Sequence, residues 1–270
     1  MTTIASGHLR EQQASVHQAS VHPVTLSRMI GVELRKMFDT RSGFWLMASI
    51  GLAAVLSMIS TIVFAPDSQL TYYTFARAIG FPMTVVLPII AILSITGEWS
   101  QRSGLTTFAL VPHRNHVVLA KTIASVTVGI VSMLFAMVVG VVGNLLGTAI
   151  AGTGLVWDLS FAHAVNIVLG SLLCLLTGTM LGVLFRSSPV ALVAYFVMTL
   201  LLPMLFGLLA SRQPGFQDVH PWVDLNNAEA ALFDGTLTAA EWAHLAVTVT
   251  VWLILPAIIG IRLVMKSEVK

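Results

Sequence analysis

Charged residues are scarce in this sequence. Only 10% of its 270 residues are Asp, Glu, Lys or Arg, whereas 56% are hydrophobic. Soluble domains carry about 25% charged residues, because their exterior must face water. The composition therefore excludes an ordinary soluble domain and favours a chain whose solvent is the hydrocarbon core of a bilayer.

Cysteine is nearly absent as well. Cys174 is the only one, so the chain cannot form an internal disulfide and the redox compartment is not indicated. Because Cys174 lies in an apolar run, we expect it to be a small space-filling side chain. Residues 1–22 lack the apolar core of a signal peptide and repeat the motif ASVH. They predict a disordered polar tail rather than a metal site, since no cysteine or carboxylate cluster accompanies the histidines.

The motifs of common catalytic and nucleotide-binding sites are also missing. No GxxxxGK[ST] phosphate loop is present, and around Lys121-Thr122 the positions of its glycines hold Ala120 and Asn115. There is no HExxH zinc motif and no GxS nucleophile elbow. We therefore expect a chain that is not an enzyme and that binds no cofactor or metal itself.

Long apolar stretches dominate the sequence instead. About 20 apolar residues cross a hydrocarbon layer of roughly 30 Å as a helix, and six stretches reach that length without a charged residue. They predict an all-α integral membrane protein, with one six-helix domain over 43–265. The predicted spans are 43–65, 78–97, 122–150, 162–185, 187–210 and 242–261.

Lysine and arginine are distributed unevenly between the segments that join these spans. If the N-terminus is cytoplasmic, six crossings return the C-terminus to the cytoplasm, and only Arg77 and Arg212 lie outside. The sequence thus predicts a multi-pass protein of the cell membrane with both termini cytoplasmic. The cytoplasmic basic residues would be Arg10, Arg28, Arg35, Lys36, Arg41, Arg102, Arg114, Lys121, Arg186, Arg262, Lys266 and Lys270.

The segment 23–41, just before the first span, has the apolar spacing of an amphipathic helix. Its polar side would carry Arg28, Glu33, Arg35 and Lys36. We expect this helix to lie at the inner membrane interface, either as an anchor or as a docking element for a partner. The apolar face would hold Leu26, Met29, Ile30, Leu34, Met37 and Phe38.

The external side has one long loop, residues 211–241. Within it, Thr238 and Glu241 have the spacing of a capping box that would start the sixth span.

Glycines within the spans predict close helix packing. These glycines are Gly140, Gly143, Gly147, Gly178 and Gly182.

The six spans contain no Asp, Glu, Lys or Arg and no ionisable residue at mid-depth, because His163 and His244 lie near external helix ends. Carriers driven by protons or sodium usually embed such a residue in a span, so the absence disfavours a secondary carrier. Asn144 and Asn166 are the strongest polar candidates. Either could line a path or donate a hydrogen bond to a neighbouring helix.

One polar segment, residues 98–121, separates the second span from the third. Between 99 and 110 it is long enough for about two to three helical turns, which Pro112 would end. Its marked residues occur in the order Glu98, Gly104, Pro112, Arg114 and Lys121.

This order, together with six spans, an N-terminal amphipathic helix and a large loop before the sixth span, resembles the permease of the type 2 exporter class of ABC transporters. The resemblance covers about residues 23–270. It implies that 98–121 is a coupling segment that docks in a separate ATP-binding subunit, and that ATP and Mg²⁺ are bound there. It also implies two copies of each subunit, with a second permease chain that is most simply identical.

The resemblance further implies that substrate passes between two permease copies, along the second and fifth spans. Residues that could form this path, or equally face lipid or pack in the core, are Phe81, Met83, Tyr195, Phe196 and Met198, with Asn144 on the third span. Glu98 would pair with a basic residue of the docking site or of the N-terminal helix, and Gly104 would allow a close approach. Arg114 and Lys121 would pair with acidic residues or lipid phosphates, or simply anchor the chain.

The expected function is therefore the permease subunit of an ATP-driven exporter, with membrane lipid and an ATPase as partners and no role for nucleic acid. Two alternatives stay open at this level. One is a non-transporting scaffold or immunity factor, and the other is a secondary carrier. An adjacent gene for a phosphate-loop ATPase would favour the exporter.

Overall fold

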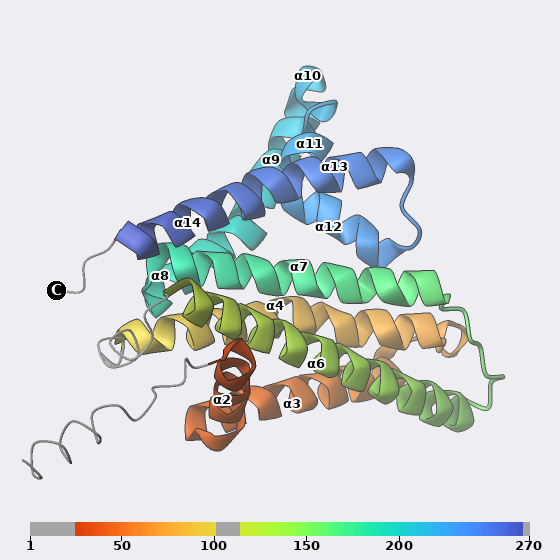
Figure 1. The fold of residues 1–270 in the computed structure, drawn as a ribbon. Coiled ribbons are helices and arrows are strands. Elements are labelled where there is room, and N and C mark those ends of the chain that lie inside the picture. Colours follow the sequence, from red (N-terminus) through yellow and green to blue (C-terminus); the bar gives the residue numbers. More distant parts are fainter. Residues whose placement is uncertain (1–24, 101–113, 267–270) are drawn as a thin grey trace, which may run out of the picture.

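The computed structural model describes residues 25–100 and 114–266, and this part of the chain is a bundle of helices without strands (Figure 1). Six of its helices are long and apolar enough to cross a membrane, which confirms the predicted all-α, six-span, multi-pass architecture. These six are Gly43–Phe64, Tyr72–Gly97, His116–Ala151, Phe161–Phe185, Ser188–Arg212 and Ala239–Lys266.

The first four spans are continuous helices. They are α3 (Arg41–Phe64), α4 (Tyr72–Ser100), α6 (Arg114–Ala151) and α7 (Phe161–Phe185). The helix α6 begins eight residues before the predicted third span, so Lys121 lies inside a helix and not in a connecting segment. Hydropathy marks the apolar part of a helix, whereas residues such as Arg, Ala and Lys extend the same helix into a polar environment.

The fifth and sixth spans each contain a π-helical turn. The fifth consists of α8 (Ser188–Phe196), the π-helix η2 (Val197–Leu201) and α9 (Leu202–Arg212). The sixth consists of α13 (Ala239–Val249), the π-helix η3 (Thr250–Ile254) and α14 (Leu255–Lys266). The predicted capping box is confirmed at the start of α13, where the side chains and backbones of Thr238 and Glu241 exchange hydrogen bonds.

The helices α4 and α7 form the centre of the bundle and are the most buried spans (Figure 1). Glycine allows their close contact: a Cβ atom on Gly178 would lie 2.6 Å from the carbonyl oxygen of Pro88, and one on Gly182 would lie 3.1 Å from Ile95. This confirms the close packing that these two glycines predict. Burial of a wide apolar surface around α7 then holds the other helices in place.

Short helices lie where the sequence predicts only a long external loop. After α9 come α10 (Pro214–Gln217), α11 (His220–Val223) and α12 (Leu225–Asp234). A 3₁₀ turn, η1 (Asp67–Gln69), lies between α3 and α4. The helix α12 turns back and packs along α7 and α13 (Figure 1). It does so because Leu225, Ala228 and Leu232 form an apolar stripe that is buried against them.

The N-terminal helix α2 (Leu26–Asp39) crosses the bundle at the end where α4 ends and α6 begins (Figure 1). Its buried residues are Met29, Glu33 and Met37. Phe38, which was predicted on the same apolar face as the two methionines, is 58% exposed within the chain. The prediction that Glu33 lies on the polar, outward side is therefore wrong. Glu33 faces α6, because a lysine of α6 neutralises its charge there.

Candidate functional site

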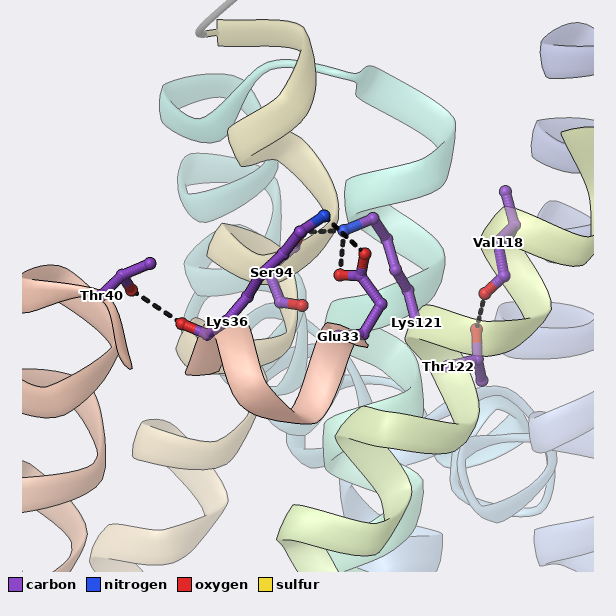
Figure 2. Close-up of polar contacts among 7 residues, drawn as sticks. All are labelled: Glu33, Lys36, Thr40, Ser94, Val118, Lys121 and Thr122. Atoms are coloured by element: carbon purple, nitrogen blue, oxygen red, sulfur yellow. Dashed lines mark hydrogen bonds and ion pairs between the residues drawn. The ribbon is translucent and has the colours of Figure 1, made fainter. Parts of the chain in front are cut away.

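An ion-pair cluster joins α2 to α6 at this end of the bundle (Figure 2). The Lys121 ammonium lies 2.6 Å from Glu33 Oε2, and the Lys36 ammonium lies 2.7 Å from Glu33 Oε1. Lys121 also donates to the backbone carbonyl of Ser94 on α4, at 3.4 Å. We call Glu33, Lys36 and Lys121 the α2–α6 ion-pair cluster. Glu33 thus joins α2 to α6 directly, and Lys121 extends the connection to α4.

Helical spacing brings these residues together. Met29 of α2 packs in one cluster with Val117 and Ala120 of α6. Residues four apart share a helix face, so Glu33 follows Met29 on α2 while Lys121 follows Val117 on α6. The apolar contact thus sets the two charged side chains opposite each other.

The corner between α2 and α3 is also fixed by hydrogen bonds. The Thr40 hydroxyl donates to the carbonyl of Lys36 and accepts from the backbone N–H of Gly43. A Cβ atom on Gly43 would lie 2.3 Å from the carbonyl oxygen of Met37, so only glycine fits this corner without a shift. The helix α2 is therefore held between α3 and α6.

The cluster is shielded from solvent. The side chains of Glu33 and Lys121 are only 9% and 5% exposed. Burial by itself would raise the pKa of Glu33, but the charge and hydrogen bond of Lys121 and the hydrogen bond of Lys36 outweigh it, so that the pKa lies below its ordinary value. Glu33 is therefore ionised at neutral pH. A buried carboxylate of this kind is costly to leave unpaired.

The residues predicted for the coupling segment are only partly placed. Gly104 and Pro112 lie outside the described residues. Glu98 and Arg114 belong to the last turn of α4 and the first turn of α6, but their side chains also lie outside the description. Lys121 alone has a placed side chain, and its partner is Glu33. The sequence pattern missed Glu33 because it lies 88 residues away from Lys121.

The residues suggested for a substrate path do not share one surface. Met83, Asn144 and Tyr195 are buried in the single chain, whereas Phe81 is 75% exposed and Phe196 is also exposed. Asn144 donates to the carbonyl of Val156, and Asn166 donates to that of Gly235. In this arrangement both asparagines therefore connect helices to neighbouring backbone.

A second buried carboxyl group, Glu229 on α12, is absent from the sequence-based candidates. Its Oε2 atom accepts the thiol hydrogen bond of Cys174 at 3.3 Å. Cys174, expected to be a mere space-filler, thus has a polar partner. The clue in the sequence was the helical spacing of Leu225, Ala228 and Leu232, which places Glu229 beside the buried stripe.

Within residues 25–100 and 114–266, no group of three or more His, Cys, Asp or Glu side chains is placed to hold a metal ion. The α2–α6 ion-pair cluster offers no nucleophile beside a base, and its chemistry is electrostatic attachment. No protein-family model matches this chain. No curated protein is significantly similar to it.

Proposed function

We propose that this chain is the permease subunit of an ATP-driven ABC exporter in the cell membrane. Two copies would work with two separate ATP-binding subunits, which bind the ATP and Mg²⁺. The observation that carries the proposal is the α2–α6 ion-pair cluster, because it joins three helices next to the segment between α4 and α6. That segment is the one whose residue order resembles the coupling segment of such permeases.

A permease without a phosphate loop must receive mechanical work from another protein. Work passes between proteins through rigid elements that bias one arrangement of helices over another. Here a displacement of the segment that precedes α6 would reach α2 through Glu33 and α4 through the Ser94 carbonyl. The cluster would thus make these three helix ends move as one body.

The positions of the basic residues support the orientation that this proposal needs. Arg28, Arg35, Arg41 and Lys266 belong to α2, the start of α3 and the end of α14, which lie at the same end of the bundle (Figure 1). Positive charge accumulates on the cytoplasmic side of membrane proteins. We therefore assign this end, and both termini, to the cytoplasm.

The purification of the intact complex tests the proposal. The tagged chain would be isolated in mild detergent from the membranes of its own cell and reconstituted in lipid vesicles. We expect a phosphate-loop ATPase to accompany it and ATP hydrolysis to rise in the presence of transported compounds. A chain that moves compounds along an ion gradient without ATP would instead be a secondary carrier, and the exporter proposal would fail.

A scaffold or immunity factor would behave differently in the same vesicles. It would confer resistance on cells but would not move a compound across the reconstituted membrane, with or without ATP. This outcome would also overturn the proposal.

A further inference from the structure

The helix α12 carries a carboxyl group deep into the helix bundle. Glu229 is 6% exposed and contacts Cys174, which lies one residue beyond the midpoint of α7. The same face of α12 is tightly fitted: a Cβ atom on Gly170 would lie 2.8 Å from the ring of Phe233. The side chain of Glu229 is thus sealed from water at half the length of a helix that can span a membrane.

The hydrogen bonding of Glu229 is incomplete. Its Oε2 atom accepts a hydrogen bond from the Cys174 thiol, whereas its Oε1 atom is buried and has no hydrogen-bond partner in the part of the chain that the structure describes. Glu33, the other buried glutamate, has two ammonium groups at 2.6 and 2.7 Å. No salt bridge is present at Glu229 among the residues that the structure describes. A carboxylate in such a place is costly, and the neutral acid is favoured.

The titratable groups that surround Glu229 do not neutralise it. Cys174 faces it from α7, and Asp224, at the start of α12, has the same sign of charge and is paired with His220 of α11. The Tyr195 hydroxyl of α8 donates to a backbone carbonyl of α4. From α13 the contact is apolar, while His244 and Glu241 line a cavity on the outer side of α12 that does not include Glu229.

We propose that Glu229 is a proton-binding site, whose carboxyl group holds a proton while α12 lies against α7 and gives it to water when α12 moves away. No other reactant is needed: one O–H bond breaks, and the carboxylate and a hydrated proton form. Burial raises the pKa of this carboxyl to about 8, because it outweighs the hydrogen bond from Cys174, which lowers the pKa, and the nearby charge of Asp224 raises the pKa further.

The attachments of α11 and α12 give the proton a mechanical consequence. Asn226 donates to the Met198 carbonyl within η2 at 3.2 Å, and Trp252 within η3 donates to the Val223 carbonyl at 2.8 Å. A π-helical turn disturbs the regular hydrogen-bond ladder, and such turns are frequent at functional sites. Movement of α12 would therefore act on the irregular turns of both the fifth and the sixth span.

The sign of the pH dependence follows from the raised pKa. A carboxyl group that is free in water titrates near 4.5, while the buried one titrates at about 8. Below the lower value Glu229 is protonated whether α12 lies against α7 or away from it, and the equilibrium preference for the position against α7 is greatest. This preference falls about tenfold for each pH unit between the two values and does not change further above the higher one.

The sole cysteine provides a direct test. Infrared spectra of the full chain in lipid nanodiscs would contain one S–H stretching band, because Cys174 is the only thiol. We expect this band to shift with pH with a midpoint of about 8, in parallel with the loss of a protonated-carboxyl band. In the Glu229→Gln variant both changes should vanish. Glu241→Gln, which removes a half-buried carboxyl near the same helix, is the matched control and should titrate as the wild type does.

Two results would overturn the proposal. One is a spectrum at about pH 6 without a protonated-carboxyl band that depends on Glu229, since the buried acid must be neutral there. The other is an S–H band that titrates equally in the Glu229→Gln variant. If that variant does not fold, the wild-type S–H band alone decides, and a constant band from about pH 6 to 9 contradicts the proposal. The test does not depend on the exporter function, because no ATPase takes part.

Discussion

Two buried glutamates, Glu33 and Glu229, show how environment decides the state of the same side chain. Glu33 has two lysine partners, and its pKa lies below the ordinary value. Glu229 accepts one hydrogen bond from a thiol, its other oxygen atom has no hydrogen-bond partner among the described residues, and its pKa is raised. The first is therefore a permanent electrostatic attachment, and the second is a group that can exchange a proton.

The ion pair between Glu33 and Lys121 makes a prediction for stability. Glu33→Met or Lys121→Met alone breaks the buried ion pair between α2 and α6, and each should lower the free energy of unfolding by about 3–5 kcal/mol. The double variant replaces both charges by apolar side chains and should recover most of this loss. Equilibrium unfolding in detergent micelles measures the four proteins of the cycle.

The exposed pair of Arg35 and Asp39 on the same helix is the control. Its side chains are largely in solvent, so Arg35→Met should cost about 0–1 kcal/mol at most. If the effects of Glu33→Met and Lys121→Met simply add in the double variant, the two residues do not interact as described.

The sequence predicts side-chain roles well only where the partner is near in the chain. Thr238 and Glu241 form the predicted capping box, because both partners lie within one turn. Lys121 was treated as a loop residue and Glu33 as an outward-facing one, because nothing local shows that they meet. Glu229 was overlooked because the absence of charge was judged from the spans alone.

At the scale of the elements, the bilayer makes the spans predictable. A helix that crosses hydrocarbon needs a long uncharged stretch, and all six were visible for this reason. Their ends were less visible, as the start of α6 at Arg114 shows. The helices α10 to α12 and the π-helices η2 and η3 were not predicted, because they depend on packing against distant helices.

The contact between α4 and α7 predicts a marked effect of a single methyl group. Gly178→Ala would place a Cβ atom 2.6 Å from the Pro88 carbonyl oxygen, so the helices must separate. We expect a loss of about 1–3 kcal/mol of stability, as for other overpacked cores. Gly207→Ala, in α9 with open space around its Cα atom, should cost nothing measurable. Equal unfolding midpoints of the two variants would contradict the close approach.

The hydrogen bond from η3 to α11 predicts a local change in dynamics. Trp252→Phe keeps an aromatic ring but removes the donor to the Val223 carbonyl. Loss of about 1 kcal/mol of local stability should speed amide hydrogen exchange in α11 and α12 by about fivefold. Trp242→Phe, in the same span but half-exposed, is the control. Exchange that is unchanged in the Trp252 variant would show that this bond does not hold the two helices.

At the scale of the whole molecule, the uneven distribution of basic residues predicts the orientation. The background is Cys174→Ala, which removes the only thiol. In intact cells, Asp218→Cys in this background should react with a membrane-impermeant maleimide. Lys266→Cys should react only after the membrane is permeabilised. The reverse pattern would place the α2–α6 ion-pair cluster outside and remove the basis for docking an ATPase.

The number of spans and the absence of a phosphate loop were readable in the sequence, because each is a local pattern. The exporter function remains a proposal suggested by resemblance, and the structure adds the α2–α6 ion-pair cluster, which joins three helices beside the segment between α4 and α6. The proposed assembly with a second copy and with an ATPase would depend on surfaces of other chains, which no pattern in this chain encodes.

The central claim is that an ATP-binding subunit drives this chain through the segment before α6. Its most direct test compares ATP hydrolysis by the reconstituted complex with and without a bulky substitution in that segment. Gly104→Trp should abolish compound-stimulated hydrolysis and transport, because it prevents a close approach of the partner. Gly154→Trp, in the loop between α6 and α7 with open space around it, should leave both unchanged. Full activity of the Gly104→Trp complex, or the absence of any ATPase from it, would contradict the account.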